Sequence, residues 1–155
     1  MIRVLLLLLL LASPALAQGR FFVEGLVGNI TLDLSNQAAF GMDLGTNGGV
    51  KELAGPFGLR GGLSLGVRQG QANFGLEAGA TFSLGRPPID PEVGVGFTAI
   101  FGGGAPVFAI RAFGGAEFAL NRNVSLLAGL VPIVQFAGGG TAFGFSIQTG
   151  LRVYP

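Results

Sequence analysis

Carboxylates and guanidinium groups are the side chains of this sequence best able to take part in chemistry, because the chain contains no histidine and no cysteine. Glu77 and Glu117 could act as a general acid and a general base. The alternative is that both belong to structural ion pairs, which we favour. Since the commonest general base and the thiolate and imidazole metal ligands are absent, we expect no enzyme activity, no metal site and no cofactor.

Two glycine-rich runs, at residues 102–104 and 138–140, resemble phosphate-binding loops in composition only. Neither run is followed by the Lys-Ser/Thr pair or the helix start that a P-loop requires. We therefore expect both runs to be turns.

The charged residues lie in segments whose apolar residues alternate with small or polar ones, which is the period of a β-strand. In the clearest segment, 71–84, every even-numbered residue is apolar and every odd-numbered residue is small, polar or charged. The same pattern predicts strands at 20–28, 57–68, 92–101, 105–120, 124–136 and 143–154. Residues 29–45 are either one long strand or a shorter strand and a loop.

The remaining segments are expected to be connections. We expect a loop at 46–56, which could include a helical turn at 50–53, and turns near 69–70 and at 85–91 and 121–123. Eight strands at this regular spacing predict an all-β barrel or sandwich. Because every connection after Pro56 is short, an antiparallel up-and-down barrel is the simplest arrangement.

The composition of the second strand face indicates which side of the barrel is apolar. A soluble barrel buries its apolar face and covers the other face with Lys and Glu, whereas a membrane barrel turns the apolar face to lipid. Here the second face is mostly Gly, Ser, Thr and Ala, and the chain has a single lysine. The strands at 105–120 and 124–136 also exceed the roughly 9–11 residues that cross a bilayer. We therefore expect an eight-stranded transmembrane barrel.

The few charges on the inner face carry both signs, so they can pair within a narrow lumen. We expect Arg111 to be the hub at mid-depth, facing Glu77 and Glu24, while the other members lie nearer the rim at which the barrel begins and ends. The predicted lumen ion-pair network consists of Glu24, Arg60, Glu77, Arg111, Glu117 and Arg152.

The N-terminus has the pattern of a secretory signal peptide. A basic start is followed by a leucine-rich core at 4–12 and by an A-x-A site ending at Ala17, which predicts cleavage after Ala17. The domain would then cover 18–155. Of nine basic residues, Arg3 precedes the cleavage site, so eight basic residues remain beside eight acidic ones. A net charge of zero gives no indication of nucleic-acid binding.

The run GGAEFALNRNVSLLAGL, at 114–130, resembles a strand–turn–strand unit of small bacterial outer-membrane barrels of the OmpA/OmpX type. The resemblance implies an eight-stranded barrel in the outer membrane, with both termini in the periplasm and 121–123 as a periplasmic turn. It also implies two kinds of partner, membrane lipids and the outer-membrane assembly machinery.

The sequence departs from that family in three ways. The family ends in an outward-facing aromatic residue, whereas here Pro155 has the outward parity and Tyr154 is expected to face inward. The chain has one tyrosine and 14 phenylalanines instead of Tyr and Trp girdles. Its outer connections are also short.

The sequence is compatible with three functions. The favoured one is a structural or interaction barrel of the outer membrane with a side-chain-filled lumen. The alternatives are a porin-like channel for small solutes and a soluble secreted lipocalin-like barrel that binds an apolar ligand. The sequence leaves the oligomeric state open.

Overall fold

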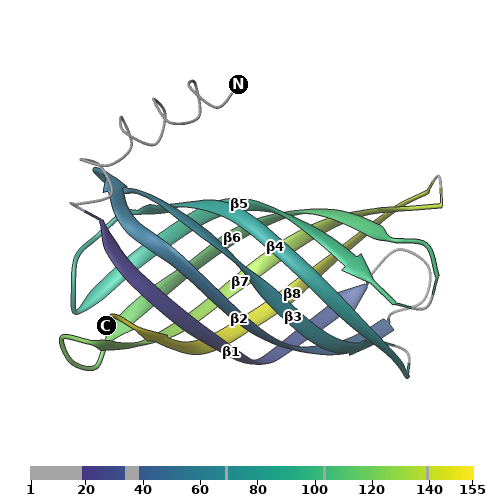
Figure 1. The fold of residues 1–155 in the computed structure, drawn as a ribbon, viewed down its shortest axis with the longest axis horizontal. Helices are drawn as coiled ribbons and strands as arrows, with labels where there is room; N and C mark the ends of the chain where they lie inside the picture. The colour runs from purple at the N-terminus through teal and green to yellow at the C-terminus, as the bar shows by residue number, and fades with distance from the viewer. Residues whose placement is uncertain (1–18, 34–38, 69, 103, 139) are drawn as a thin grey trace, which may run out of the picture.

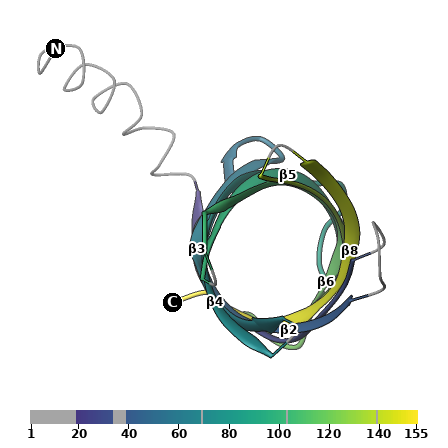
Figure 2. The same ribbon diagram turned by 90° about the vertical axis from the view of Figure 1, so that its right-hand side faces the viewer.

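The structure, a computed structural model, describes residues 19–33, 39–68, 70–102, 104–138 and 140–155. The predicted signal peptide, 1–17, lies outside these residues, so its cleavage remains a prediction. Eight antiparallel strands form one closed barrel in chain order, and β8 pairs with β1 to complete the ring (Figures 1 and 2). The strands are β1 (Arg20–Asp33), β2 (Ala39–Ala54), β3 (Phe57–Arg68), β4 (Gln71–Ser83), β5 (Ile89–Phe101), β6 (Val107–Ala119), β7 (Val124–Ala137) and β8 (Gly140–Val153).

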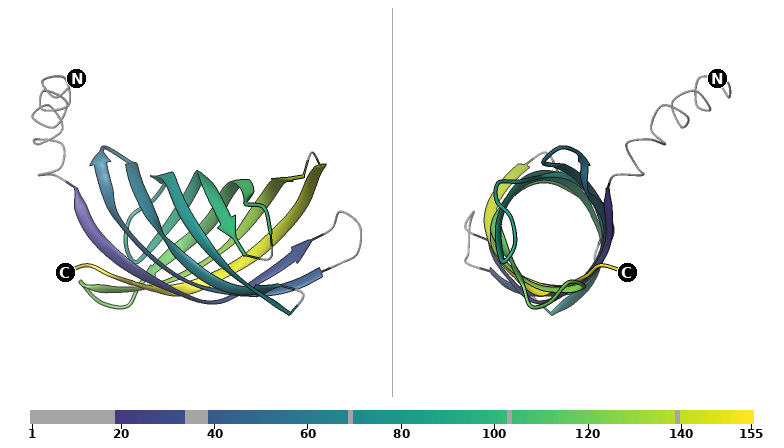
Figure 3. Two further views of the ribbon diagram at one scale, coloured as in Figure 1. Left: turned by 45° about the vertical axis from the view of Figure 1, so that its right-hand side comes forward. Right: turned by 90° about the vertical axis from the view of Figure 1, so that its left-hand side faces the viewer.

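Both ends of the described chain lie at one end of the barrel, which we call the termini end (Figure 1). The connections 55–56, 84–88 and 120–123 also lie there, and Figure 3 shows the ring of strands from that side. The opposite end, which we call the far end, is where β3, β5 and β7 finish. Among the described residues, no helix is long and apolar enough to cross a membrane.

The apolar face of the strands points outward, away from the lumen. On β7, for example, Leu126 and Leu130 are exposed, whereas the residues that follow them, Leu127 and Val131, are buried inside the barrel. From residue 57 onward the alternation predicted the two faces correctly. The lipocalin-like alternative is therefore wrong, because such a barrel needs its apolar face inside.

Of the two alternatives for 29–45, the single long strand is wrong. Instead, β1 continues to Asp33 and β2 starts at Ala39. A shift in register between Leu26 and Asn29 accompanies a change of apolar parity in β1, from odd (Phe21) to even (Ile30). The apolar residues before and after the β1–β2 connection therefore all have even numbers in the sequence. This unbroken alternation conceals the point at which the chain reverses direction.

The loop predicted at 46–56 is also wrong, because β2 runs through to Ala54 and no helical turn occurs at 50–53. Glycines at 45, 48 and 49 carry no side chain and so conceal the alternation. Gly49 is required by a close approach, because a Cβ there would collide with the ring of Phe22 and the carbonyl of Leu59. Beyond it, β2 is irregular, with Glu52 in the left-handed region at φ 58°.

Smaller differences affect the other connections. The predicted turn at 85–91 ends earlier, since β5 starts at Ile89 and includes Asp90. The turn at 121–123 lies where expected, between β6 and β7. Its geometry follows from Asn121, whose Oδ1 accepts hydrogen bonds from the backbone N–H groups of Asn123 and Val124, both at 2.9 Å.

Candidate functional site

The centre of the lumen is the guanidinium of Arg152 on β8, a side chain that is 1% exposed. Its Nη1 donates to Glu117 Oε2 at 2.8 Å and to Glu92 Oε2 at 3.0 Å. Its Nη2 and Nε donate to Glu24 Oε2 at 3.0 and 3.1 Å. The planar fork of an arginine allows one side chain to hold three carboxylates in this way. Strands β1, β5, β6 and β8 are thereby joined across the inside of the ring.

Lys51 of β2 forms the neighbouring part of the network, toward the termini end. Its Nζ lies 2.5 Å from Asp90 Oδ2 and 2.5 Å from Glu117 Oε2. Glu92 lies further away, at 3.8 Å. Glu117 is thus shared between Lys51 and Arg152, so its charge is compensated from two sides.

Tyr154 covers this cluster at the termini end, facing inward as the sequence predicted. Its hydroxyl donates to Glu117 Oε1 at 2.7 Å, and the Arg20 guanidinium lies 4.0 Å from the ring centroid. Two hydrogen bonds with Asn123 hold its backbone, at 2.8 and 2.7 Å. Burial raises the pKa of Tyr154 to about 12, so the phenol remains a donor to Glu117 even in solutions more alkaline than the ordinary pKa of 10.0.

A second part of the network extends toward the far end. Arg60 of β3 lies 3.0 Å from Glu77 and 3.6 Å from Glu24, and so connects the two carboxylates. Arg111 of β6 pairs with the other oxygen of Glu77. Asn47 donates to Glu24 Oε1 at 2.8 Å. The ion pairs therefore continue from Lys51 through Arg152 and Arg60 as far as Arg111.

The structure places all six residues of the predicted network in this lumen and brings them into contact with one another, in pairs that the sequence did not specify. The expectation that Arg111 is the hub is wrong, because Arg152 contacts three carboxylates and Glu24 pairs with Arg152 and Arg60. The cause is the register, which sets Glu24 directly opposite Arg152 where β1 and β8 meet.

Sequence reasoning missed three members of the network. The sequence predicts a loop around Lys51 and a turn around Asp90, where charged residues are normally solvated. Glu92 has the inward parity of β5, which is a sufficient signal, although the predicted network does not contain it. All three are buried.

An apolar cluster lies beside the ion pairs, on the far-end side. Its buried members are Ala109, Phe113, Val131 and Ile133. The ring of Phe113 also lies 5.0 Å from the guanidinium of Arg60. A cavity of about 10 Å³ beside Phe113, Val131 and Arg60 leaves room for about one water.

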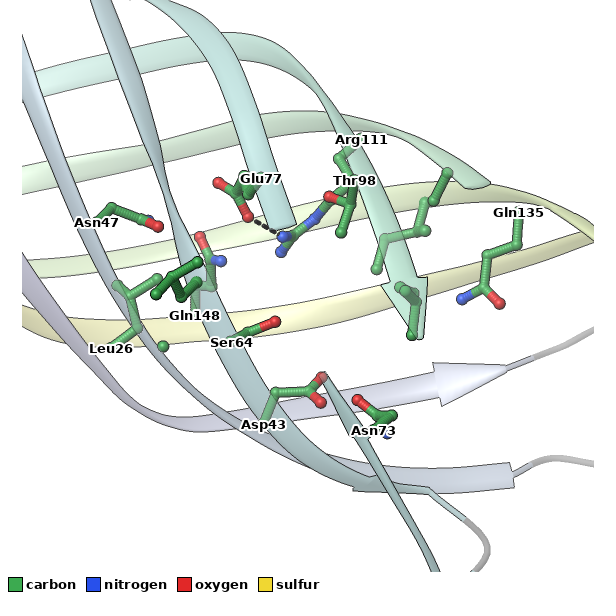
Figure 4. A pocket seen from close by; sticks show the side chains of 15 residues that line it. Leu26, Asp43, Asn47, Ser64, Asn73, Glu77, Thr98, Arg111, Gln135 and Gln148 are labelled. Atoms are coloured by element: carbon green, nitrogen blue, oxygen red, sulfur yellow. Dashed lines mark hydrogen bonds and ion pairs between the residues drawn. The ribbon is translucent and has the colours of Figure 1, made fainter. Parts of the chain in front are cut away.

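Beyond the apolar cluster lies a cavity of about 40 Å³, which we call the polar chamber (Figure 4). Carboxamides, hydroxyls and charged groups converge on it from most of the strands. The buried atoms in its wall that make no hydrogen bond within the described part of the protein include Thr98 Oγ1 and Gln148 Nε2. Its polar lining residues are Asp43, Asn47, Ser64, Asn73, Glu77, Thr98, Arg111, Gln135 and Gln148. Within the described ranges, no three carboxylates are grouped as ligands for a metal ion.

Known structures with the same architecture were found, whereas no family model and no curated protein matches the sequence. Neisserial surface protein A matches with a TM-score of 0.72 and 15% identity, over 87% of this chain and 97% of that one. The N-terminal β-barrel domain of Pseudomonas aeruginosa OprF matches with a TM-score of 0.52 and 16% identity, over 87% and 99%. A de novo designed transmembrane β-barrel gives 0.51 and 16%, over 88% and 96%.

These likenesses, together with the outward apolar face, define the class of protein. The chain has the fold of the small eight-stranded transmembrane β-barrels, as the run at 114–130 predicted. At this level of identity the likeness concerns the fold, and function has to be argued from the site.

Proposed function

We propose that this protein is an integral barrel of the bacterial outer membrane with a structural or interaction role and a closed lumen. Exposed apolar residues on several strands, such as Leu65, Leu76, Val95 and Leu130 on β3, β4, β5 and β7, support a lipid-facing exterior. The predicted signal peptide at 1–17 supports export. On this proposal, the termini end faces the periplasm, and the partners are membrane lipids and the outer-membrane assembly machinery.

The observation that carries the proposal of a closed lumen is the convergence of buried side chains on Arg152. Carboxylates on β1, β5 and β6 accept hydrogen bonds from this guanidinium, which belongs to β8. Side chains from different parts of the ring therefore meet inside the lumen. Eight-stranded barrels have interiors that side chains can fill completely. The adjoining apolar cluster fills further space in the lumen beside the ion pairs.

We propose a non-catalytic role because the candidate acid and base are both ion-paired. The two carboxylates that could act as an acid and a base are each held by cations, Glu77 by Arg60 and Arg111, and Glu117 by Lys51 and Arg152. A carboxylate saturated in this way is not available to a substrate proton.

The porin-like alternative is favoured by one feature, the polar chamber. However, the wall of the chamber includes the ion pair of Glu77 and Arg111 and two members of the apolar cluster, Ala109 and Ile133. We therefore infer that the chamber is a dead end and not one part of a continuous pore.

Reconstituted protein is expected to give no long-lived, porin-sized conductance steps in planar lipid bilayers, because the ion pairs and the apolar cluster block the lumen. A general porin in the same bilayers provides the positive control. Repeated large steps from the pure barrel would show that the lumen opens and would favour the channel alternative.

Fractionation of cells tests the location. We expect the mature protein in the outer-membrane fraction, released by detergent and not by salt, since the exterior is apolar and not charged. Recovery of most of the protein in the soluble periplasmic fraction without detergent would contradict the proposal.

A further inference from the structure

The polar chamber contains hydrogen-bonding groups that the protein itself does not satisfy. Thr98 Oγ1 and Gln148 Nε2 are buried in its wall without a partner in the described structure, and both side chains are more than nine-tenths buried. Leaving such a group unsatisfied destabilises a folded protein, so buried polar atoms normally bond to protein, water or a ligand. These two atoms therefore indicate that the chamber takes up a hydrogen-bonding molecule.

The chemistry of the wall indicates what kind of molecule fits. Four carboxamides and two hydroxyls line the chamber, from Asn47, Asn73, Gln135, Gln148, Ser64 and Thr98. Carboxamides supply both donors and acceptors, and hydroxyls can do either. Such a wall complements a ligand that both donates and accepts hydrogen bonds, as an alcohol does.

The charged side chains around the chamber interact with other groups of the protein. Glu77 pairs with Arg60 and Arg111, and Asp43 also has a partner in the structure. A charged ligand would lose its hydration without gaining a dedicated counter-charge. The wall therefore favours an uncharged ligand.

The size of the chamber limits the ligand further. Its volume of about 40 Å³ corresponds to about three water positions. We propose that the polar chamber is a binding site for a small uncharged solute with hydroxyl groups, about the size of ethylene glycol. A solute of this kind would displace water from the chamber without passing the apolar cluster below it.

The test is a titration followed by NMR on the full-length mature barrel in detergent micelles. The signals observed are the side-chain amide of Gln148 and the backbone amide of Thr98. Ethylene glycol is compared with acetate and ethanolammonium, which have the same number of non-hydrogen atoms but carry a charge. We expect saturable shifts with ethylene glycol at a Kd on the order of millimolar, and affinities at least about tenfold weaker for both ions.

A matched pair of threonine variants separates specific binding from general effects. Thr98→Val removes a hydroxyl that lines the chamber, whereas Thr81→Val removes an equally buried hydroxyl elsewhere in the lumen. We expect the first to weaken ethylene glycol binding roughly threefold to tenfold and the second to leave it unchanged. If Thr98→Val does not fold, Gln148→Met provides the same comparison.

Three results would overturn the proposal. They are equal weakening by Thr81→Val, tighter binding of either ion than of ethylene glycol, and the absence of any saturable shift at Gln148 up to about molar solute. None of them would affect the conductance experiment, so the failure of this inference and the failure of the closed-lumen proposal can be distinguished.

Discussion

Replacing Arg152 with leucine is expected to lower the free energy of unfolding in lipid vesicles by about 3–5 kcal/mol. The substitution removes the cation that Glu24, Glu92 and Glu117 share, while the three carboxylates stay buried. Leucine cannot satisfy any of them, and Lys51 reaches only part of the cluster. The measurement is the urea midpoint of unfolding, converted to free energy with the slope of the transition.

Arg111→Leu is the matched control, because it removes the same kind of side chain from a less enclosed position. The Arg111 side chain is 14% exposed and faces the polar chamber, and Glu77 would keep Arg60 at 3.0 Å. We expect a smaller loss, about 1–2 kcal/mol. Ala112→Leu, on the lipid-facing side of the same strand, should change little. Equal losses from Arg152→Leu and Arg111→Leu would show that Arg152 is not the hub.

The location of the hub shows what the sequence could and could not predict about the site. The alternation placed charges of both signs on the inner face, because side-chain direction in a strand depends only on parity. It did not identify which charges meet. Glu24 and Arg152 are 128 residues apart and become neighbours only when β8 pairs with β1, so their contact depends on how the whole ring closes.

Lys51 illustrates a different limit of prediction from the sequence. Glycines around it conceal the alternation of β2, and a lysine in such a stretch is normally solvated. In the barrel its burial is tolerated because Asp90 and Glu117 lie within 2.5 Å of its ammonium group. Those partners come from β5 and β6, so no local feature of 46–56 could indicate that the segment is a strand with an inward charge. Beyond residue 57, where fewer such conflicts occur, the strands were predicted well.

The second large effect concerns the outside of the barrel. Replacing Leu130 with arginine is expected to lower the free energy of unfolding in vesicles by about 2–4 kcal/mol, the cost of a charge near the bilayer midplane. Leu130 lies near the middle of β7, points outward and is 55% exposed. In a soluble barrel the same change would place a charge in water, with little cost. The measurement is again the urea midpoint in lipid vesicles.

Leu120→Arg is the control that separates the effect of depth in the bilayer from the effect of side-chain exposure. Leu120 is 58% exposed, nearly the same as Leu130, but it lies just past the end of β6 in the connection at the termini end. An arginine there can reach the headgroup region, so we expect a loss of about 0–1 kcal/mol. If Leu130→Arg and Leu120→Arg both lowered the free energy of unfolding by the same small amount, the exposed leucines of β7 would not face the hydrocarbon core. A large loss at Leu120 and a small one at Leu130 would instead place the midplane at the termini end, and the assignment of that end to the periplasmic rim would then be wrong.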